Sequence, residues 1–451
     1  MAVRTTTFLG QADGQEQCTR PRASRMGSFS DSMNSARVCR LAFMAAAFVV
    51  SAAASAADEG SAGEGVLTPS LVYDGSAIGV LHGGEREGST YVGSLHLRLQ
   101  ATAPAASAWA GTTALIDVRS LHGRPPGAWV GDAQGVTNIA GPSGTDIEEL
   151  WVQHNFAGST ASVLGGIYDL NTEFYRLQAA GLFLNSSFGI GPEFSQSGLE
   201  GPSIFPRTAM GVRVAAKPAP GVVLRAALLD GVPVVRPDGS RGAFRPGDGA
   251  LAVAEAAFLS RPTAAADEQG SPRDRIGRFS SLSPYQDKLA LGVWHYTGSY
   301  PDVGPAGAFG ALQHGSSGAY AVGEWRLLGR SADAAQTLAG FMQLGTASSG
   351  TNRFQTYVGV GLVGTGWVPG RPGDQIGLAV ASARNGSPYL QSQQVQGLDT
   401  TAAETTVELS YLTQITKWLI MQPDLQYVMH PDTSGALRNA WVAQLRFELT
   451  F

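Results

Sequence analysis

The C-terminal stretch RNAWVAQLRFELTF, residues 438–451, alternates between apolar and polar side chains. Its apolar set is Trp441, Ala443, Leu445, Phe447 and Leu449, and its polar set is Gln444, Arg446, Glu448 and Thr450. Side chains of a β-strand point alternately to its two faces, so this period of two predicts a strand with one apolar and one polar face. A soluble sheet could use such a strand, but soluble chains seldom finish on a large apolar residue such as Phe451. The question is which solvent the apolar face meets.

The same alternation recurs along the chain. It is clear in YVGSLHLRLQ at 91–100, in AMGVRVAA at 209–216 and in DKLALGVWHY at 287–296. No segment after residue 56 has the roughly 18 uninterrupted apolar residues of a membrane-crossing helix. The alternating runs predict sixteen strands that begin near residues 71, 91, 112, 148, 163, 209, 222, 250, 287, 319, 335, 354, 374, 405, 418 and 438.

The lengths of the connections indicate how these strands are arranged. Every second connection is mostly short, as in AGST near 158, KPAPG at 217–221 and TK at 416, and the interleaved ones are longer. Segment 261–286 departs from this pattern, because it is long where a short turn is expected. An even number of strands with turns at one end and loops at the other predicts an all-β fold, a 16-stranded antiparallel transmembrane β-barrel of the outer-membrane porin type. A secreted β-sandwich or jelly roll is the soluble alternative.

Residues 1–56 have the features of an upstream extension followed by a signal peptide. Arg37 and Arg40 precede the apolar run LAFMAAAFVV at 41–50, and small residues follow up to Ala56. This order is typical of a secretory signal peptide cut after Ala56, and the apolar run is short for a membrane anchor, which is the alternative. Both cysteines, Cys18 and Cys39, precede the cut, so we expect an exported chain from residue 57 without a disulfide or a thiolate site.

Charge and motif spacing argue against several classes of function. Of 31 basic and 36 acidic residues, 6 basic and 3 acidic ones precede residue 57. The remaining residues carry a formal net charge of 25 − 33 = −8, which argues against a nucleic-acid partner. GVGLVG at 359–364 fits a dinucleotide-binding pattern but lies within an alternating run. The seven histidines show no metal-ligand spacing and stand beside no catalytic serine motif. We therefore expect no enzyme activity, cofactor or metal; a barrel hydrolase is the alternative, without a nameable nucleophile.

The connection near residues 175–206 is too long and too apolar for a simple surface loop. It is rich in glycine and aromatic residues, and loops of this length usually pack on something. The interior of a barrel is the available place. We therefore predict one porin domain over 57–451 in which this loop packs inward, with an outer cap on neighbouring loops as the alternative.

Five motifs follow one another in the centre of the chain: GDAQGVTNI at 131–139, ELWVQ at 149–153, GIYDLNTEF at 166–174, GLFLNSSFGIGP at 181–192 and GPSIFP at 201–206. On these motifs the chain resembles the carbohydrate-selective porins of the OprB type, and the likeness extends more loosely to the terminal strand. The resemblance implies a monomeric or homotrimeric barrel in outer-membrane lipid of a bacterial cell, through which carbohydrate solutes diffuse passively.

Sugar recognition asks for aromatic rings that stack on a pyranose and for charged or amide groups that hydrogen-bond its hydroxyls. The polar faces of the strands beside the loop supply both kinds. We predict that the pore lining and the substrate contacts come from Arg98, Asp117, Arg119, Glu149, Trp151, Gln153, Asn155, Arg213 and Arg225. Arginines across from carboxylates would set up a transverse field that orients polar solutes. For each single residue, the alternative is an ordinary lumen side chain in water.

Two other functions stay open at this point. One alternative is a general or anion-selective porin, and the narrowest point of an anion-selective pore should be lined by Lys or Arg without acidic partners. The other is a non-transporting adhesin or scaffold, which would need no inward set of arginines and carboxylates. We also interpret Phe451, at the end of its alternating strand, as an assembly signal for the outer-membrane assembly machinery.

Overall fold

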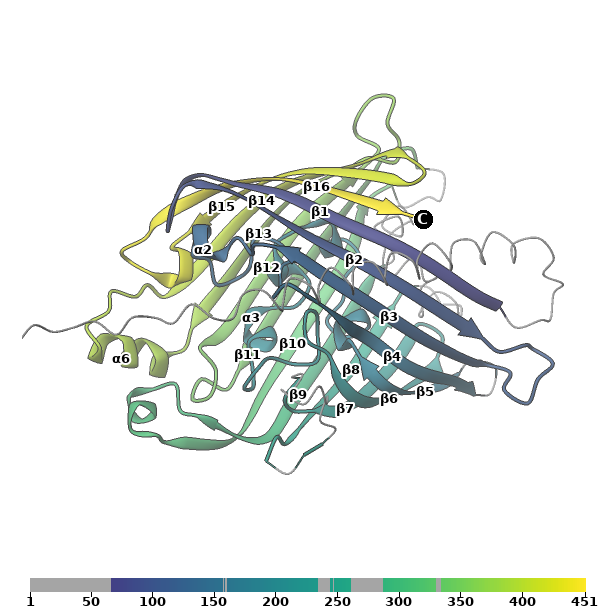
Figure 1. The fold of residues 1–451 in the computed structure, drawn as a ribbon, viewed down its shortest axis with the longest axis horizontal. Helices are drawn as coiled ribbons and strands as arrows, with labels where there is room; N and C mark the ends of the chain where they lie inside the picture. The colour runs from purple at the N-terminus through teal and green to yellow at the C-terminus, as the bar shows by residue number, and fades with distance from the viewer. Residues whose placement is uncertain are drawn as a thin grey trace, which may run out of the picture. The chain divides into compact units, whose positions relative to one another are not determined.

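The computed structural model describes residues 66–156, 158, 160–233, 244–245, 247–260, 287–329 and 334–451. Within these ranges sixteen strands form one closed antiparallel barrel, in which β1 pairs with β16 (Figure 1). The strands are β1 (Val66–Gly84), β2 (Gly88–Thr102), β3 (Thr112–Gly123), β4 (Gly144–Phe156), β5 (Ala161–Tyr168), β6 (Ala209–Ala219), β7 (Val222–Asp230), β8 (Ala250–Leu259), β9 (Lys288–Pro301), β10 (Leu312–Leu328), β11 (Thr337–Ala347), β12 (Phe354–Thr365), β13 (Gln375–Asn385), β14 (Ala403–Thr416), β15 (Leu419–Met429) and β16 (Arg438–Thr450). The predicted 16-stranded all-β barrel is confirmed.

Most strands begin within a few residues of the predicted positions. The largest differences are β10, which begins at Leu312 and not near 319, and β1, which begins at Val66 and not near 71. Segment 261–286 lies outside the described residues, but β8 and β9 on either side of it pair directly, from Leu259 opposite Lys288 onward. The strand count therefore does not slip there. The predicted signal peptide and upstream extension also lie outside the described residues.

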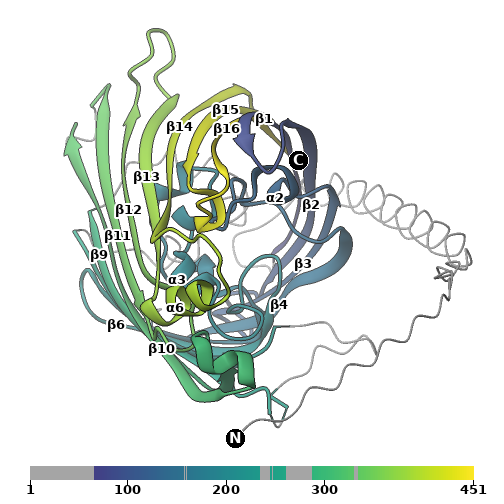
Figure 2. The same cartoon turned by 90° about the vertical axis from the view of Figure 1, so that its left-hand side faces the viewer.

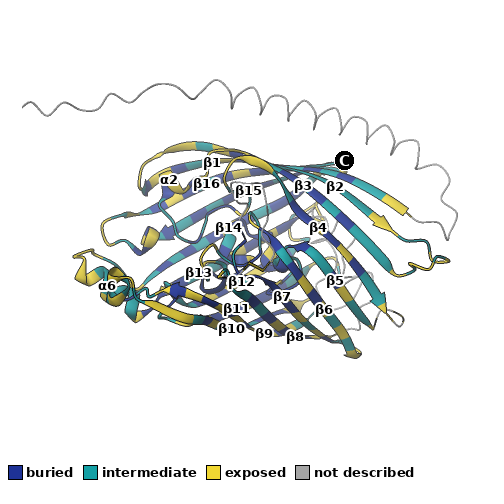
Figure 3. Ribbon diagram, turned by 60° about the horizontal axis from the view of Figure 1, so that its bottom comes forward, coloured by how far each residue is buried: buried dark blue, intermediate teal, exposed yellow. Residues whose placement is uncertain are grey.

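The two faces of each strand differ in exposure, as the period of two predicts. On β4 the side chains of Leu150 and Val152 are exposed, whereas Trp151 and Gln153 between them are buried. The same alternation of buried and exposed residues runs along the strands in Figure 3. Since a spanning barrel must turn an apolar surface to lipid and can keep polar groups inside, the exposed apolar face is the outer face of the wall.

Two connections at the same end of the barrel carry short helical turns and pack on its inner wall. The β3–β4 connection includes α2 (Gly127–Val130). The β5–β6 connection includes η2 (Leu170–Thr172), η3 (Ala180–Leu182), η4 (Ser186–Phe188) and α3 (Pro192–Ser195). Figure 2 shows α3 within the ring of strands. We call these the β3–β4 loop (124–143) and the β5–β6 loop (169–208), and we call this end of the barrel the long-loop end.

The main apolar cluster of the molecule joins the β5–β6 loop to the wall. Loop residues Phe183, Phe188 and Phe194 belong to the same buried cluster as Trp294 of β9 and Phe341 of β11. A second cluster joins Val130 and Val136 of the β3–β4 loop to the inner faces of β1, β2, β15 and β16. The core of this barrel is therefore built between the loops and the wall. In the described part of the chain, no helix is both long enough and apolar enough to cross a membrane.

Candidate functional site

Arg98 and Asp117 form an ion pair on the inner face of β2 and β3. The two residues are directly opposite each other in the strand register, and Arg98 Nε lies 2.6 Å from Asp117 Oδ2. His96 Nδ1 lies 3.1 Å from the same carboxylate oxygen, and Ser94 Oγ lies 3.0 Å from His96 Nε2. The predicted residues Arg98 and Asp117 are thus brought together, because neighbouring inward positions of paired strands are in contact.

Arg119 pairs with Glu148, a residue outside the predicted set. The register jumps from Asp117 opposite Glu149 to Val118 opposite Ile147, so Glu148 is the extra residue of a β-bulge. The bulge turns both Glu148 and Glu149 inward, and both are buried. Arg119 Nη1 lies 2.9 Å from Glu148 Oε2. The glutamate pair in IEELW was the available signal, because a strictly alternating strand would send one of the two charges into lipid.

The guanidinium of Arg119 also holds the end of the β5–β6 loop. Its Nη1 donates to the carbonyl oxygen of Pro206 at 2.9 Å, and its Cζ lies 5.1 Å from the centre of the Phe205 ring. Phe205 and Pro206 are half-buried, whereas Arg119 is almost fully buried. Arg119 therefore holds these two loop residues in place, and its own side chain is covered from solvent.

Glu149 and Trp151 form a second inward contact on β4. Trp151 Nε1 donates to Glu149 Oε1 at 3.2 Å, and the tryptophan is only 4% exposed. The two predicted site residues are adjacent, but neither presents an open surface to solvent. A buried Trp side chain with its N–H bonded is the usual arrangement for this residue type.

Arg213 of β6 joins the wall to the first turn of the β5–β6 loop. Its Nε lies 2.8 Å from Glu173 Oε2, and its Nη2 donates to Glu173 Oε1 at 2.9 Å and to Gln153 Oε1 at 2.7 Å. Gln153 Nε2 in turn donates to Asn155 Oδ1 at 3.0 Å. The predicted residues Gln153, Asn155 and Arg213 therefore lie in one network. The sequence prediction did not include Glu173, because Glu173 lies in a loop and the alternation of a strand cannot assign a loop residue to the inner or outer face.

Arg225 of β7 forms a separate pair with Glu255 of β8. The two are opposite in the register, with Arg225 Nη1 3.2 Å from Glu255 Oε1. The other oxygen of Glu255 accepts hydrogen bonds from the backbone N–H of Tyr175 at 2.9 Å and from the hydroxyl of Tyr320 at 2.8 Å. Glu255, a lone charge in AVAEAAFL, was also missed.

Inward carboxylates hold the backbone of the β5–β6 loop. Glu324 of β10 accepts from the N–H groups of Gln178 and Ala179 at 3.1 and 2.7 Å. Glu408 of β14 accepts from the N–H groups of Leu184 and Asn185 at 2.5 and 3.0 Å. A loop inside a barrel has few waters to satisfy its backbone, so such acceptors replace them.

Asp169 joins the two ends of the β5–β6 loop. Its Oδ1 accepts from the N–H of Asn171 at 2.8 Å and its Oδ2 from the N–H of Phe205 at 3.3 Å. Burial, together with the neighbouring charges of Glu149 and Glu148, raises the pKa of Asp169 to about 8. This carboxyl is therefore neutral at pH 7.

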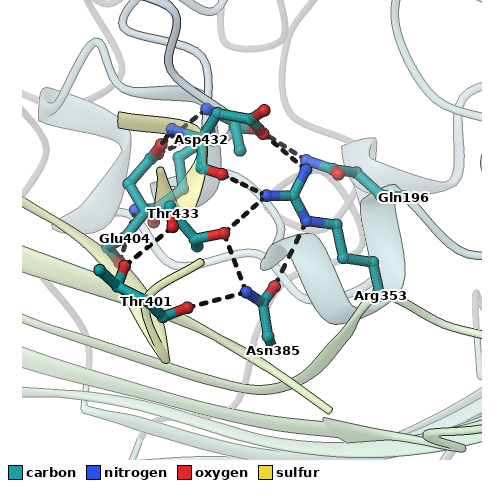
Figure 4. A network of polar contacts seen from close by, with 9 residues as sticks. Gln196, Arg353, Asn385, Thr401, Glu404, Asp432 and Thr433 are labelled. Carbon is teal, nitrogen blue, oxygen red and sulfur yellow. Dashed lines mark hydrogen bonds and ion pairs between the residues drawn. The ribbon is translucent and has the colours of Figure 1, made fainter. Parts of the chain in front are cut away.

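A polar network at the long-loop end is centred on Arg353 (Figure 4). The guanidinium Nη1 lies 2.6 Å from Asp432 Oδ1, Nη2 donates to the Asp432 carbonyl at 2.7 Å, and Nε donates to Asn385 Oδ1 at 3.3 Å. The cation also lies over the ring of Tyr389 in α6 (Ser387–Val395) at 4.9 Å. The network thus links the β11–β12, β13–β14 and β15–β16 connections.

Glu404 of β14 extends this network to both inner loops. Its carboxylate accepts from the N–H groups of Asp432, Ala133 and Gln134 at 2.6, 2.8 and 2.9 Å. Gln196 of the β5–β6 loop donates to the Ala133 carbonyl at 2.7 Å. Loops from five connections are therefore held against one another. Among the described residues, no group of three or more His, Cys, Asp or Glu is arranged to hold a metal ion.

Comparisons with known proteins add to this geometry. A family model described as "Carbohydrate-selective porin, OprB family" matches residues 86–451. Porin B of Pseudomonas aeruginosa is 29% identical over 147 residues, which cover 30% of this chain and 32% of Porin B, so the matched region spans about a third of that relative. A high-pH structure of Pseudomonas putida OprB matches with a TM-score of 0.71 at 19% identity, over 85% of this chain and 94% of that one. At that identity the structural likeness shows the fold.

Proposed function

Because the chain belongs to the carbohydrate-selective porin, OprB family, we propose that its barrel lets neutral mono- or oligosaccharides diffuse passively across the bacterial outer membrane. The resemblance seen in the central motifs is thereby confirmed, and the family is one of channels, not of enzymes. The state of assembly, monomer or homotrimer, and delivery by the outer-membrane assembly machinery belong to this proposal.

The observation that carries the proposal is the pairing of cations with carboxylates along the inner wall. Each of four inward arginines has an acidic partner within 3.2 Å: Arg98 with Asp117, Arg119 with Glu148, Arg213 with Glu173 and Arg225 with Glu255. A pore selective for anions needs positive charge without compensation at its narrow part. Paired charges leave the lumen without a net attraction for either anions or cations, which suits an uncharged solute.

The burial of these groups decides how each would act on a solute. Arg119, Glu149 and Trp151 are at most 5% exposed, so we assign them to the support of the loop and to the field across the lumen. The half-buried Phe205, held from one side by Arg119, is the ring that we propose for contact with the apolar face of a sugar. Trp151 would then act through Glu149, to which it donates its N–H.

The test is ion-current block by glucose and by larger maltodextrins in planar bilayers. We expect Phe205→Ala to weaken sugar block with little change in open conductance. We expect Glu148→Gln to leave Arg119 uncompensated and so to raise the preference for anions over cations. Glu200→Gln is the matched control, because Glu200 is an exposed acid in the same loop, paired with the exposed Arg207.

The alternatives are a general or anion-selective porin and a non-transporting barrel. A wild-type channel whose current is blocked no better by sugars than by amino acids or anions of equal size would favour the first. A barrel that gives no conductance at all would favour an adhesin or scaffold.

A further inference from the structure

Glu193, in α3 of the β5–β6 loop, is a buried acid that the proposed sugar pathway does not use. The residue is 0% exposed. Its Oε1 accepts a hydrogen bond from the Tyr175 hydroxyl at 2.9 Å, and its Oε2 is buried without a hydrogen-bond partner. A buried carboxylate oxygen with no donor is costly if the group is ionised.

The barrel wall has a socket for this carboxyl. A Cβ placed on Gly345 of β11 would lie 1.8 Å from Glu193 Oε1 and 2.2 Å from its Cδ, so only glycine fits beneath the side chain. Tyr357 of β12 and Tyr175 lie beside the neighbouring Gly191, where a Cβ would lie 2.5 Å from Tyr357 Cδ1 and 2.8 Å from the Tyr175 hydroxyl. The carboxyl therefore fills a fitted position between α3 and the inner wall.

The titratable groups around the socket are tyrosines and acids. The loop supplies Tyr175, β12 supplies Tyr357, and β10 supplies Tyr320, whose ring centre lies 4.5 Å from that of Tyr175. Beyond these rings, Glu255 of β8 accepts hydrogen bonds from the backbone N–H of Tyr175 and from the hydroxyl of Tyr320. Glu408 of β14 interacts electrostatically with Tyr357. From β11 the inward neighbours are Gly345 and Gln343, which do not titrate. A negative charge on Glu193 would thus face further acids.

We propose that Glu193 is a proton-operated latch: its neutral carboxyl holds α3 against Gly345, and loss of the proton releases α3 from the wall into the lumen. The inference rests on the proposed channel function, because the released helix would narrow the path for solutes. It is a regulatory device that the family match does not assign.

The acid–base properties of the loop agree with this geometry. Burial raises the pKa of Glu193 to about 7, while the hydrogen bond from Tyr175 acts in the opposite direction. Burial also raises the pKa of Tyr175 well above its usual value, so its hydroxyl stays a donor. Between the ordinary carboxyl pKa near 4.5 and about pH 7, the packed form then loses about tenfold in population per pH unit relative to a released form with an ordinary carboxyl, and the loss levels off above pH 7.

Single-channel conductance between pH 4.5 and pH 9 tests the latch. We expect wild type to lose at least half of its conductance as the pH rises toward about 7, with no further loss above that pH. Glu193→Gln, which keeps the shape and stays neutral, should hold the low-pH conductance throughout. Gly345→Ala, which fills the socket, should give the high-pH conductance at every pH, and so replaces the first variant if that fails to insert.

Glu200→Gln, at an exposed acid of the same loop, is the matched control and should keep the wild-type pH transition. A wild-type channel with constant conductance across the range would overturn the latch and leave the channel function standing. Glu193→Gln with an unchanged pH transition would also overturn it. Absence of any conductance would instead contradict the proposed function itself.

Discussion

Asp169 shows how one carboxyl can make the stability of this barrel depend on pH. Its pKa is raised to about 8 in the folded chain, mainly by burial, whereas an unfolded Asp titrates near 4. Between these two values the folded form keeps a proton that the unfolded form has lost. The free energy of unfolding should therefore fall as the pH rises from about 4 to about 8, and level off above that.

The variant Asp169→Asn tests this linkage. The amide oxygen can still accept from Asn171 or Phe205 but carries no proton to lose, so the variant should gain in stability relative to wild type as the pH rises. Urea unfolding in detergent at pH 5 and pH 9 measures the difference. A wild-type to variant difference that is the same at both pH values would show that Asp169 is ionised in the folded barrel.

At the scale of single residues, sequence reasoning found the cations better than their partners. Arg98, Arg119, Arg213 and Arg225 all lie on the inner wall, because a period of two places an inward charge once the strand is found. The partners Glu148 and Glu173 depend on a bulge and on a folded loop. Neither a bulge nor a loop path follows from periodicity, so these contacts could not be predicted.

The β5–β6 loop is held as an element by wall carboxylates, and Glu408 is the clearest case. Glu408→Ala would leave the N–H groups of Leu184 and Asn185 without their acceptor, at a cost of about 1–3 kcal/mol for each buried group. We expect faster proteolysis of the loop and noisier open-channel current. Gln414→Ala on the same strand is the control and should change neither.

Equal protease resistance of Glu408→Ala and wild type would show that the apolar cluster alone seats the loop. This cluster includes Phe183 and Phe188, whose rings lie 5.7 and 5.9 Å from that of Phe341 of β11. The sequence predicted a loop near 175–206 that needs a packing partner. Which strands it meets depends on contacts between residues far apart in the chain, for which a single sequence gives no pattern.

Arginine substitutions on two strands test which face of the barrel wall is the outer one. Leu409 lies in the middle of β14 with its side chain exposed, so Leu409→Arg should destabilise the barrel by about 2–4 kcal/mol if that position faces the middle of the bilayer. Ser382→Arg, two residues from the native Arg384 near the long-loop end of β13, should cost about 0–1 kcal/mol. Unfolding in lipid vesicles measures both, and equal costs would show that the face or the depth is misassigned.

For the whole molecule, the last strand closes the barrel through its backbone. The N–H of Phe451 donates to the carbonyl of Leu71 at 2.9 Å, and the N–H of Leu71 donates to the carbonyl of Phe451 at 3.1 Å, while the Phe451 side chain is 66% exposed. Phe451→Ala keeps both backbone bonds. If the ring is an assembly signal, the variant should insert poorly in cells and refold normally in detergent. Equal loss in the two assays would make it a packing residue.

The strand order was predictable for the whole molecule because each strand pairs with its sequence neighbour, which leaves the alternating pattern and the turns to define the barrel. The contacts that the β3–β4 loop makes with the wall were not predictable. The β3–β4 loop was expected to carry a family motif, but its bonds to the wall, such as Gln426 Nε2 to the Val136 carbonyl at 2.9 Å, join residues far apart in the chain.

We propose that this barrel selects uncharged sugars through an inner wall of paired charges. Liposome swelling tests it most directly, with glucose, gluconate and an amino acid of similar size compared on the same preparation of wild-type protein. Balanced pairs such as Arg98 with Asp117 and Arg119 with Glu148 give no net pull on an anion, so we expect glucose to enter faster than gluconate. Gluconate entry as fast as glucose entry, or faster, would contradict the account and make the protein a general or anion-selective porin.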